Sequence, residues 1–185
     1  MEHRICGWVK QNDSQYVDYH NNEWGKAIHD DNALFELFSL ETQSSGLSWL
    51  TILKKRDGYR EVFENFSLET VASYTQDDVN RIFESELVIK SRPKIEAIIN
   101  NAKLFLEIKK EFGSINNYFW SKVNHKTIIN DVIDYKMALS TSEISDELAK
   151  DLKKRGFKFV GSVTIYSFMQ ASGMINDHEN SCWCK

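Results

Sequence analysis

The spacing of apolar residues predicts helices along most of the chain. The clearest helix opens at Pro93, because proline is favoured in the first turn of a helix. Apolar residues then recur every three or four positions, which places them on one helix face, and Gly113 ends the pattern. These residues are Ile95, Ile98, Ile99, Ala102, Phe105 and Leu106. The breadth of this face predicts a helix at the centre of the core.

The same spacing predicts a second helix after residues 30–32, whose side chains can cap a helix N-terminus. Leu34, Leu37 and Phe38 lie on one stripe of this helix, and Glu41 falls on the same stripe. A carboxyl group therefore stands where the pattern calls for an apolar residue. Residues 44–46 predict a short loop, and Ser48 can cap a further helix that carries Trp49, Ile52, Leu53 and Arg56.

Two more helices are predicted towards the C-terminal end. One covers residues 145–155, with Leu148 and Leu152 four positions apart. The other is ended by Gly173 and carries Ile165, Phe168, Met169 and Ser172, although its β-branched start also permits a strand. Residues 127–132 fit either a short strand or an extended connection and are left unassigned.

Composition supports a helical protein. The 185 residues are 42% hydrophobic, which excludes disorder, and they hold one proline and eight glycines, too few for the turns of a sandwich or barrel. We expect an all-α fold in a single unit spanning residues 1–185. No apolar run is long enough to cross a bilayer, and the N-terminal residues lack a signal-peptide core. We therefore expect a cytoplasmic protein without membrane partners.

The cysteines lie only at the ends of the chain, at Cys6, Cys182 and Cys184. An odd number in a cytoplasmic protein argues against a disulfide framework. Four side chains predict a metal site instead: Cys6, His20, His178 and Cys182. Two thiolates and two imidazoles would form a closed tetrahedral zinc site that clamps the termini together. The alternative is a zinc-dependent hydrolase in which Cys6 is free and water takes the fourth position.

The net charge of −4, from 23 basic and 27 acidic residues, would weakly repel nucleic acid, so local charge has to decide. Residues 156–161 place Gly156 and Gly161 at the ends of a turn between two predicted helices. Ser162 stands where a nucleotide-binding phosphate loop needs lysine. The turn instead resembles the helix-hairpin-helix element, in which backbone N–H groups bind a DNA phosphate, with Lys154 and Lys158 adding charge. A plain turn with solvated lysines is the alternative.

Taken together, these motifs resemble one family, 3-methyladenine DNA glycosylase I, over essentially the whole chain. The resemblance rests on Cys6-Gly7-Trp8-Val9, residues 19–25, residues 40–49, residues 153–161, and Asn176-Asp177-His178 with Cys182. Departures from the family pattern are Thr42, Ser44, Ser45 and Trp183.

The resemblance implies an enzyme that hydrolyses the N-glycosidic bond of 3-methyladenine in alkylated double-stranded DNA and leaves an abasic site. It implies a structural zinc on Cys6, His20, His178 and Cys182, and a monomer. The family's base pocket falls on Glu41, Tyr19 and Trp49, with Glu41 as the catalytic candidate. Methylation makes the base cationic, so a carboxylate and aromatic faces suit its recognition. A zinc-clamped helix-hairpin-helix module that binds DNA without cleaving it is the non-enzymatic alternative.

Overall fold

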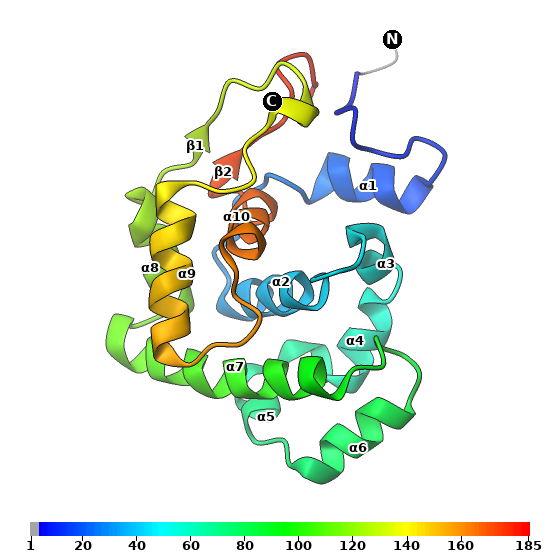
Figure 1. Cartoon of the computed structure of the whole chain (residues 1–185), viewed down its shortest axis with the longest axis vertical. Coiled ribbons are helices and arrows are strands. Elements are labelled where there is room, and N and C mark those ends of the chain that lie inside the picture. The colour runs from blue at the N-terminus through cyan, green and yellow to red at the C-terminus, as the bar shows by residue number, and fades with distance from the viewer. Residues whose placement is uncertain (1–3) are drawn as a thin grey trace.

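The computed structural model describes residues 4–185, which form a mostly helical fold (Figure 1). The helices are α1 (Ser14–Asn22), α2 (Asp31–Gln43), α3 (Trp49–Leu53), α4 (Arg56–Val62), α5 (Leu68–Ala72), α6 (Gln76–Glu84), α7 (Arg92–Phe112), α8 (Ile115–Trp120), α9 (Glu143–Arg155) and α10 (Ser162–Ala171). Short 3-10 turns cover Glu64–Phe66, Ser121–Val123 and Tyr135–Met137. The expected helical class is confirmed, but the fold is not purely helical, because β1 (Ile128–Ile129) and β2 (Ile175–Asn176) pair in parallel.

Local signals set the helix ends as expected. The Asp30 side chain accepts a hydrogen bond from the Ala33 N–H at 2.9 Å and caps α2. Pro93 lies in the first turn of α7, which ends at Gly113 in a left-handed conformation with φ 83°. Residues 162–171 are helical, so the strand alternative for α10 is excluded. The helices α2 and α7 were predicted correctly because a signal at the helix end and an apolar stripe agree.

The prediction of one helix from Ser48 through Arg56 is wrong. The helix α3 ends at Leu53, and Arg56 opens the separate helix α4. The hydrogen bond from the Lys55 N–H to the Ile52 carbonyl, at 2.9 Å, closes a tight turn that ends α3. The helices α1, α5, α6 and α8 had no predicted counterpart.

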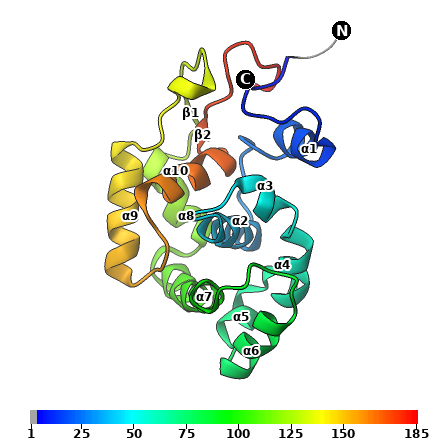
Figure 2. The same cartoon turned by 45° about the vertical axis from the view of Figure 1, so that its right-hand side comes forward.

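The helix α2 lies at the centre of the molecule, with α7, α8 and α10 packed around it (Figures 1 and 2). Phe38 of α2 is 1% exposed and contacts four other phenylalanine rings with centroids 4.9–5.8 Å away. These rings are Phe105, Phe119, Phe157 and Phe168. Because α7, α8, α10 and the turn before α10 supply them, this aromatic cluster fixes α2 relative to the C-terminal half.

The two ends of the described chain meet at the end of the molecule opposite α5 and α6 (Figures 1 and 2). The Trp183 N–H donates to the Arg4 carbonyl at 3.0 Å, and the pairing of β1 with β2 ties the C-terminal segment to residues 128–129. None of the helices in residues 4–185 has the length and apolar character needed to cross a membrane.

Candidate functional site

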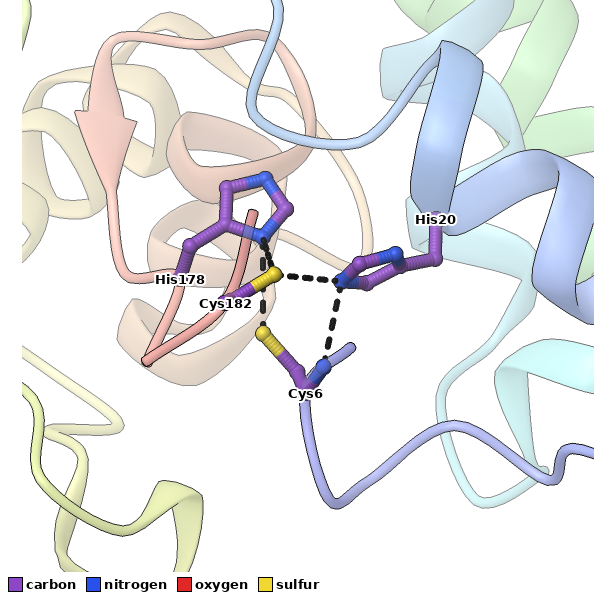
Figure 3. A group of neighbouring side chains, drawn as sticks. All are labelled: Cys6, His20, His178 and Cys182. Atoms are coloured by element: carbon purple, nitrogen blue, oxygen red, sulfur yellow. Dashed lines mark hydrogen bonds between the residues drawn. The ribbon is translucent and has the colours of Figure 1, made fainter. Parts of the chain in front are cut away.

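Four side chains from the two ends of the chain converge in one buried cluster (Figure 3). The sulfurs of Cys6 and Cys182 and the ring nitrogens of His20 and His178 all lie within 4.8 Å of one another. Cys6 Sγ is 3.4 Å from His178 Nδ1, and Cys182 Sγ is 3.5 Å from His20 Nε2. The four residues expected from the sequence are thus brought together, and the cluster could hold a metal ion.

Neighbouring groups orient both imidazoles of this cluster. The outer nitrogen of His178, Nε2, donates to the Trp24 carbonyl at 3.2 Å, and Nδ1 of His20 donates to Asn21 Oδ1 at 2.8 Å. Each ring therefore presents its lone pair to the sulfurs, as metal-binding histidines do. Burial lowers the pKa of His178 to about 4, so this ring is neutral near pH 7.

Backbone N–H groups point at both sulfurs. The Glu179 N–H donates to Cys6 Sγ at 3.3 Å, and the Cys184 N–H donates to Cys182 Sγ at 3.4 Å. Burial raises the pKa of Cys6 to about 12, so the thiol stays protonated unless a cation compensates for desolvation. The donor set, two sulfurs and two nitrogens with N–H groups aimed at the sulfurs, suits a divalent metal of intermediate softness.

Next to this cluster lies a pocket of about 720 Å³ that contains the three expected base-pocket residues, Tyr19, Glu41 and Trp49. The rings of Tyr19 and Trp49 lie with centroids 5.4 Å apart at an angle of 44°. The indole Nε1 of Trp49 is buried and has no hydrogen-bond partner among the described residues. An aromatic wall with an unused donor is thus available to a planar polar ligand.

Glu41 is the unusual group of this pocket. Its side chain comes from the last turn of α2, is 6% exposed, and has no hydrogen-bond partner among the described residues. Burial raises the pKa of Glu41 to about 8, so the carboxyl is largely protonated at neutral pH. Burial raises the pKa of Tyr16 and of Tyr19, and the nearby carboxyl of Glu41 raises both further.

Two pocket residues missed by the sequence analysis are tryptophans that also pack on the metal-type cluster. Trp8 and Trp24 line the pocket, and their ring centroids lie 5.4 and 6.4 Å from that of His20. Their closeness to predicted ligands in the sequence could have identified them, because Trp8 stands two positions after Cys6 and Trp24 stands four positions after His20. Tyr16 also lines the pocket. The cluster and the pocket therefore share a wall.

Asp177 forms another part of the pocket wall, directly before His178. Its carboxylate accepts hydrogen bonds from Tyr166 Oη at 2.8 Å, Gln170 Nε2 at 2.7 Å and Asn130 Nδ2 at 2.7 Å. These three donors occupy both carboxylate oxygens, whereas Glu41 has none. The two buried acids of the pocket are thus in opposite environments.

The loop before α9 lines a further part of the pocket, through Tyr135 and residues 138–140. The N–H of Tyr135 donates to Glu179 Oε1 at 2.9 Å, and the N–H of Gly7 donates to Glu179 Oε2 at 3.0 Å. A Cβ on Gly7 would lie 3.1 Å from the Tyr135 ring, so the ring packs directly on this glycine. Glu179, adjacent to His178, therefore attaches the loop to the N-terminal segment.

The turn between α9 and α10 is held from inside the molecule. Asn101 of α7 is buried; its Oδ1 accepts from the Lys158 N–H at 2.9 Å and its Nδ2 donates to the Lys158 carbonyl at 3.2 Å. Gly156 has φ 98°, which favours glycine, and Gly161 caps α10 without a side-chain hydrogen bond. Val163 and Thr164 in the first turn of α10 line the pocket.

The lysines near this turn are exposed, whereas the arginine is engaged elsewhere. Lys154 and Lys158 form no ion pair in the described part of the chain. Arg155 pairs with Glu111 at 2.6 Å and with Asp151 at 2.9 Å. The exposed charge at this turn therefore comes from lysine.

Comparison with known proteins places these features in context. The family model described as methyladenine glycosylase matches residues 8–185. The DNA-3-methyladenine glycosylase of Haemophilus influenzae is 46% identical over 180 residues, which cover 97% of each chain. A crystal structure of 3-methyladenine DNA glycosylase I superposes with a TM-score of 0.94 at 43% identity, covering 98% of this chain and 99% of that one. Another, of a variant in complex with 3-methyladenine, has a TM-score of 0.92 at 39% identity, covering 95% and 94%.

Burial of Glu41 predicts a pH-dependent cost to folding. The pKa is raised from 4.5 to about 8, so the folded protein holds more protons than the unfolded chain between these values, and stability falls as pH rises through this window. The loss reaches about 5 kcal/mol at most. Glu41→Gln removes this pH-dependent loss of stability. The free energy of unfolding in urea should therefore rise for the variant relative to the wild type as pH increases from 5 to 8. Glu61→Gln, at an exposed site, is the control, and parallel profiles for Glu41→Gln and wild type would show that Glu41 is ionised in the folded protein.

Proposed function

The chain belongs to the methyladenine glycosylase family, and from this membership we propose that it is a DNA-3-methyladenine glycosylase. It hydrolyses the N-glycosidic bond of 3-methyladenine in alkylated double-stranded DNA, releases the base and leaves an abasic site. The observation that carries this proposal is the unpartnered, buried carboxyl of Glu41 in an aromatic pocket. Release of free 3-methyladenine from alkylated DNA tests it directly, since a protein that only binds DNA would release none.

Glu41 matches the charge of the substrate. An adenine methylated at N3 in DNA is cationic, and a cation beside the carboxyl would offset the desolvation that keeps it protonated. Tyr19 and Trp49 would cover the faces of the base, where a cation gains about 0.5–2 kcal/mol over an aromatic ring. Unmodified adenine carries no charge and gains less from both. Because the cationic base leaves readily, recognition rather than acid catalysis is the main task of this pocket.

The substrate must be taken out of the base stack to reach Glu41. We infer that the turn with Gly156 and Gly161, together with the free N–H groups at the start of α10, binds a phosphate next to the flipped nucleotide as a helix-hairpin-helix element. Support comes from Val163 and Thr164, which join the first turn of α10 to the pocket. Lys154 and Lys158 add positive charge without reading sequence.

We infer that Cys6, His20, His178 and Cys182 hold one structural zinc ion. Zinc bonds of about 2.3 Å to sulfur and about 2.0–2.1 Å to nitrogen, arranged tetrahedrally, separate nitrogen from sulfur by about 3.6 Å. The separations of 3.4, 3.5 and 3.6 Å between sulfur and ring nitrogen fit this value. Zinc would supply a closed, tetrahedral clamp between the termini.

The two alternatives from the sequence are less well supported. A zinc-dependent hydrolase needs an open coordination position, and Cys6 approaches His178 as closely as Cys182 does, which favours four protein ligands. A non-cleaving DNA-binding module gives no reason to bury Glu41 in a pocket. Since residues from both ends of the chain line the pocket, we also infer that residues 1–185 act as one unit and as a monomer.

Loss of one ligand should release the metal and destabilise the protein. Cys182→Ala is expected to abolish zinc binding and to lower the melting temperature, because the remaining buried donors lose their common partner. Cys184→Ala is the matched control and should retain both. Elemental analysis with thermal unfolding measures these effects; full zinc content in Cys182→Ala would contradict the ligand assignment, and unchanged melting would remove its structural role.

The lysines of the turn should contribute charge without sequence preference. Lys154→Ala and Lys158→Ala are expected to weaken DNA binding about equally for all sequences, and each should reduce the salt slope by about one charge contact. Affinity for free 3-methyladenine should not change. Binding titrations at several salt concentrations measure this, and an unaltered slope in both variants would place the phosphate contacts elsewhere.

Replacement of Glu41 separates charge recognition from shape. Glu41→Gln should weaken binding of 3-methyladenine by about 1–3 kcal/mol, with folding and metal content retained. Excision of the cationic nucleotide under subsaturating conditions, which reports on the free protein, should rise with pH up to about pH 8 in the wild type, since the pKa of Glu41 is about 8 and binding requires the ionised form. The variant should lack this rise. Base titration and single-turnover excision measure the two effects, and equal base affinities would refute the pocket assignment.

A further inference from the structure

The end of α2 and the loop after it are held by the first turn of α7. The ammonium of Lys94 donates to the carbonyl of Gln43 at 2.7 Å and to the carbonyl of Ser45 at 2.7 Å. The last carbonyls of a helix lack partners inside the helix, and no other donor in the described part of the chain reaches these two. A cation here also lies at the negative end of the helix dipole.

The contact is reciprocal and extends into the core. Gln43, which is fully buried, donates from Nε2 to the Lys94 carbonyl at 3.0 Å. Its Oε1 accepts from Tyr59 Oη at 3.2 Å, and the same hydroxyl accepts from the Ile89 N–H at 3.2 Å. Lys94 and Gln43 therefore form a closed ring of hydrogen bonds that joins α2 to α7 and to the segment before it.

This ring fixes one rim of the pocket. Ser44, Ser45, Gly46 and Leu47 line the pocket directly after Gln43, and Glu41 lies two residues before it. Gly46 has φ 79°, and nothing in the described chain lies within 4 Å of a Cβ placed there, so this residue has little packing of its own. The rim is held at Ser44 by hydrogen bonds to the carbonyls of Leu40 and Glu41, and on either side of Ser44 by Lys94, through the carbonyls of Gln43 and Ser45.

Lys94 differs from the basic residues near it in the groups to which it donates hydrogen bonds. Lys90 forms an exposed ion pair with Glu86, and Arg92 bonds to Asn80. The ammonium of Lys94 is directed at backbone carbonyls, and desolvation lowers its pKa. The ammonium group of Lys94 therefore faces the protein backbone.

We propose that Lys94 is a positioning residue for base recognition, which sets the pocket rim and Glu41 through the carbonyls of Gln43 and Ser45, and is not a DNA phosphate contact. The proposal rests on the proposed glycosylase function. It assigns to the first turn of α7 a role in substrate specificity, although this turn itself does not line the pocket.

The test compares Lys94→Met, Lys94→Arg and the control Lys90→Met. Lys94→Met is expected to lower affinity for free 3-methyladenine about tenfold, since two carbonyls lose a charge-assisted partner. It should lower the single-turnover excision rate at saturating DNA, and leave the salt slope of DNA binding unchanged. Hydrogen exchange of the Leu47 amide, which donates to the Ser44 carbonyl at 2.7 Å, should become faster. Lys94→Arg should restore most of each property, and Lys90→Met should alter none.

The outcomes separate the possibilities. A weaker DNA affinity with a shallower salt slope and unchanged base affinity would make Lys94 a phosphate contact and overturn the proposal. Wild-type values for base affinity and excision in Lys94→Met would also overturn it. If Lys94→Met does not fold, Lys94→Gln, which keeps a polar NH2 group but removes the charge, takes its place in the same comparison. Failure of the wild-type protein to release 3-methyladenine would refute the proposed function instead, before any variant is considered.

Discussion

The pocket depends on the two ends of the chain being held together at the cluster of Cys6, His20, His178 and Cys182. Trp8 and Trp24 pack against the imidazoles of this cluster and also line the pocket. Glu179, next to His178, attaches the Tyr135 loop to Gly7. A metal ion at the cluster would therefore stabilise more than the termini, since one whole wall of the pocket is assembled from neighbours of its ligands.

The part of the pocket that contains Glu41 is held in place for a different reason. Glu41 belongs to the central helix α2, whose aromatic neighbours fix its position, and so the helix holds the carboxyl at a buried place in the pocket. Burying an unpaired acid opposes folding, and such departures from local consistency are typical of functional sites. The contrast with Asp177, whose oxygens are fully used, marks Glu41 as the acid with unused binding capacity.

Sequence patterns were sufficient where one local signal and one periodic signal coincided, as in α2 and α7. The short helices α1, α5 and α8 had no predicted counterpart, because they gain their stability from packing rather than from a long apolar stripe. The helix α6 was overlooked although it carries both signals, a capping box of Thr75 and Asp78 and an apolar face with Val79 and Ile82. Residue type and location near the two ends of the chain suggested the four metal-type residues, but their convergence rests on a fold that joins distant segments. The aromatic contribution of Trp8 and Trp24 was hidden because an aromatic residue in a pocket and one in a core look alike in sequence. Likewise, only the structure shows that the ammonium of Lys94 donates hydrogen bonds to backbone carbonyls.

The contact between Cys6 and His178 spans 172 residues of the chain. At synthesis rates of about 5–20 residues per second, Cys6 waits roughly 9–34 s for His178 to be synthesised. During this time the central helices can pack, because Phe38, Phe105 and Phe119 are made well before residue 178, but the wall that carries Trp8 and Trp24 has nothing to close against. The pocket wall that carries Trp8 and Trp24 can therefore be completed only after residues 178–182 are made, when the residues of the central helices have already been synthesised.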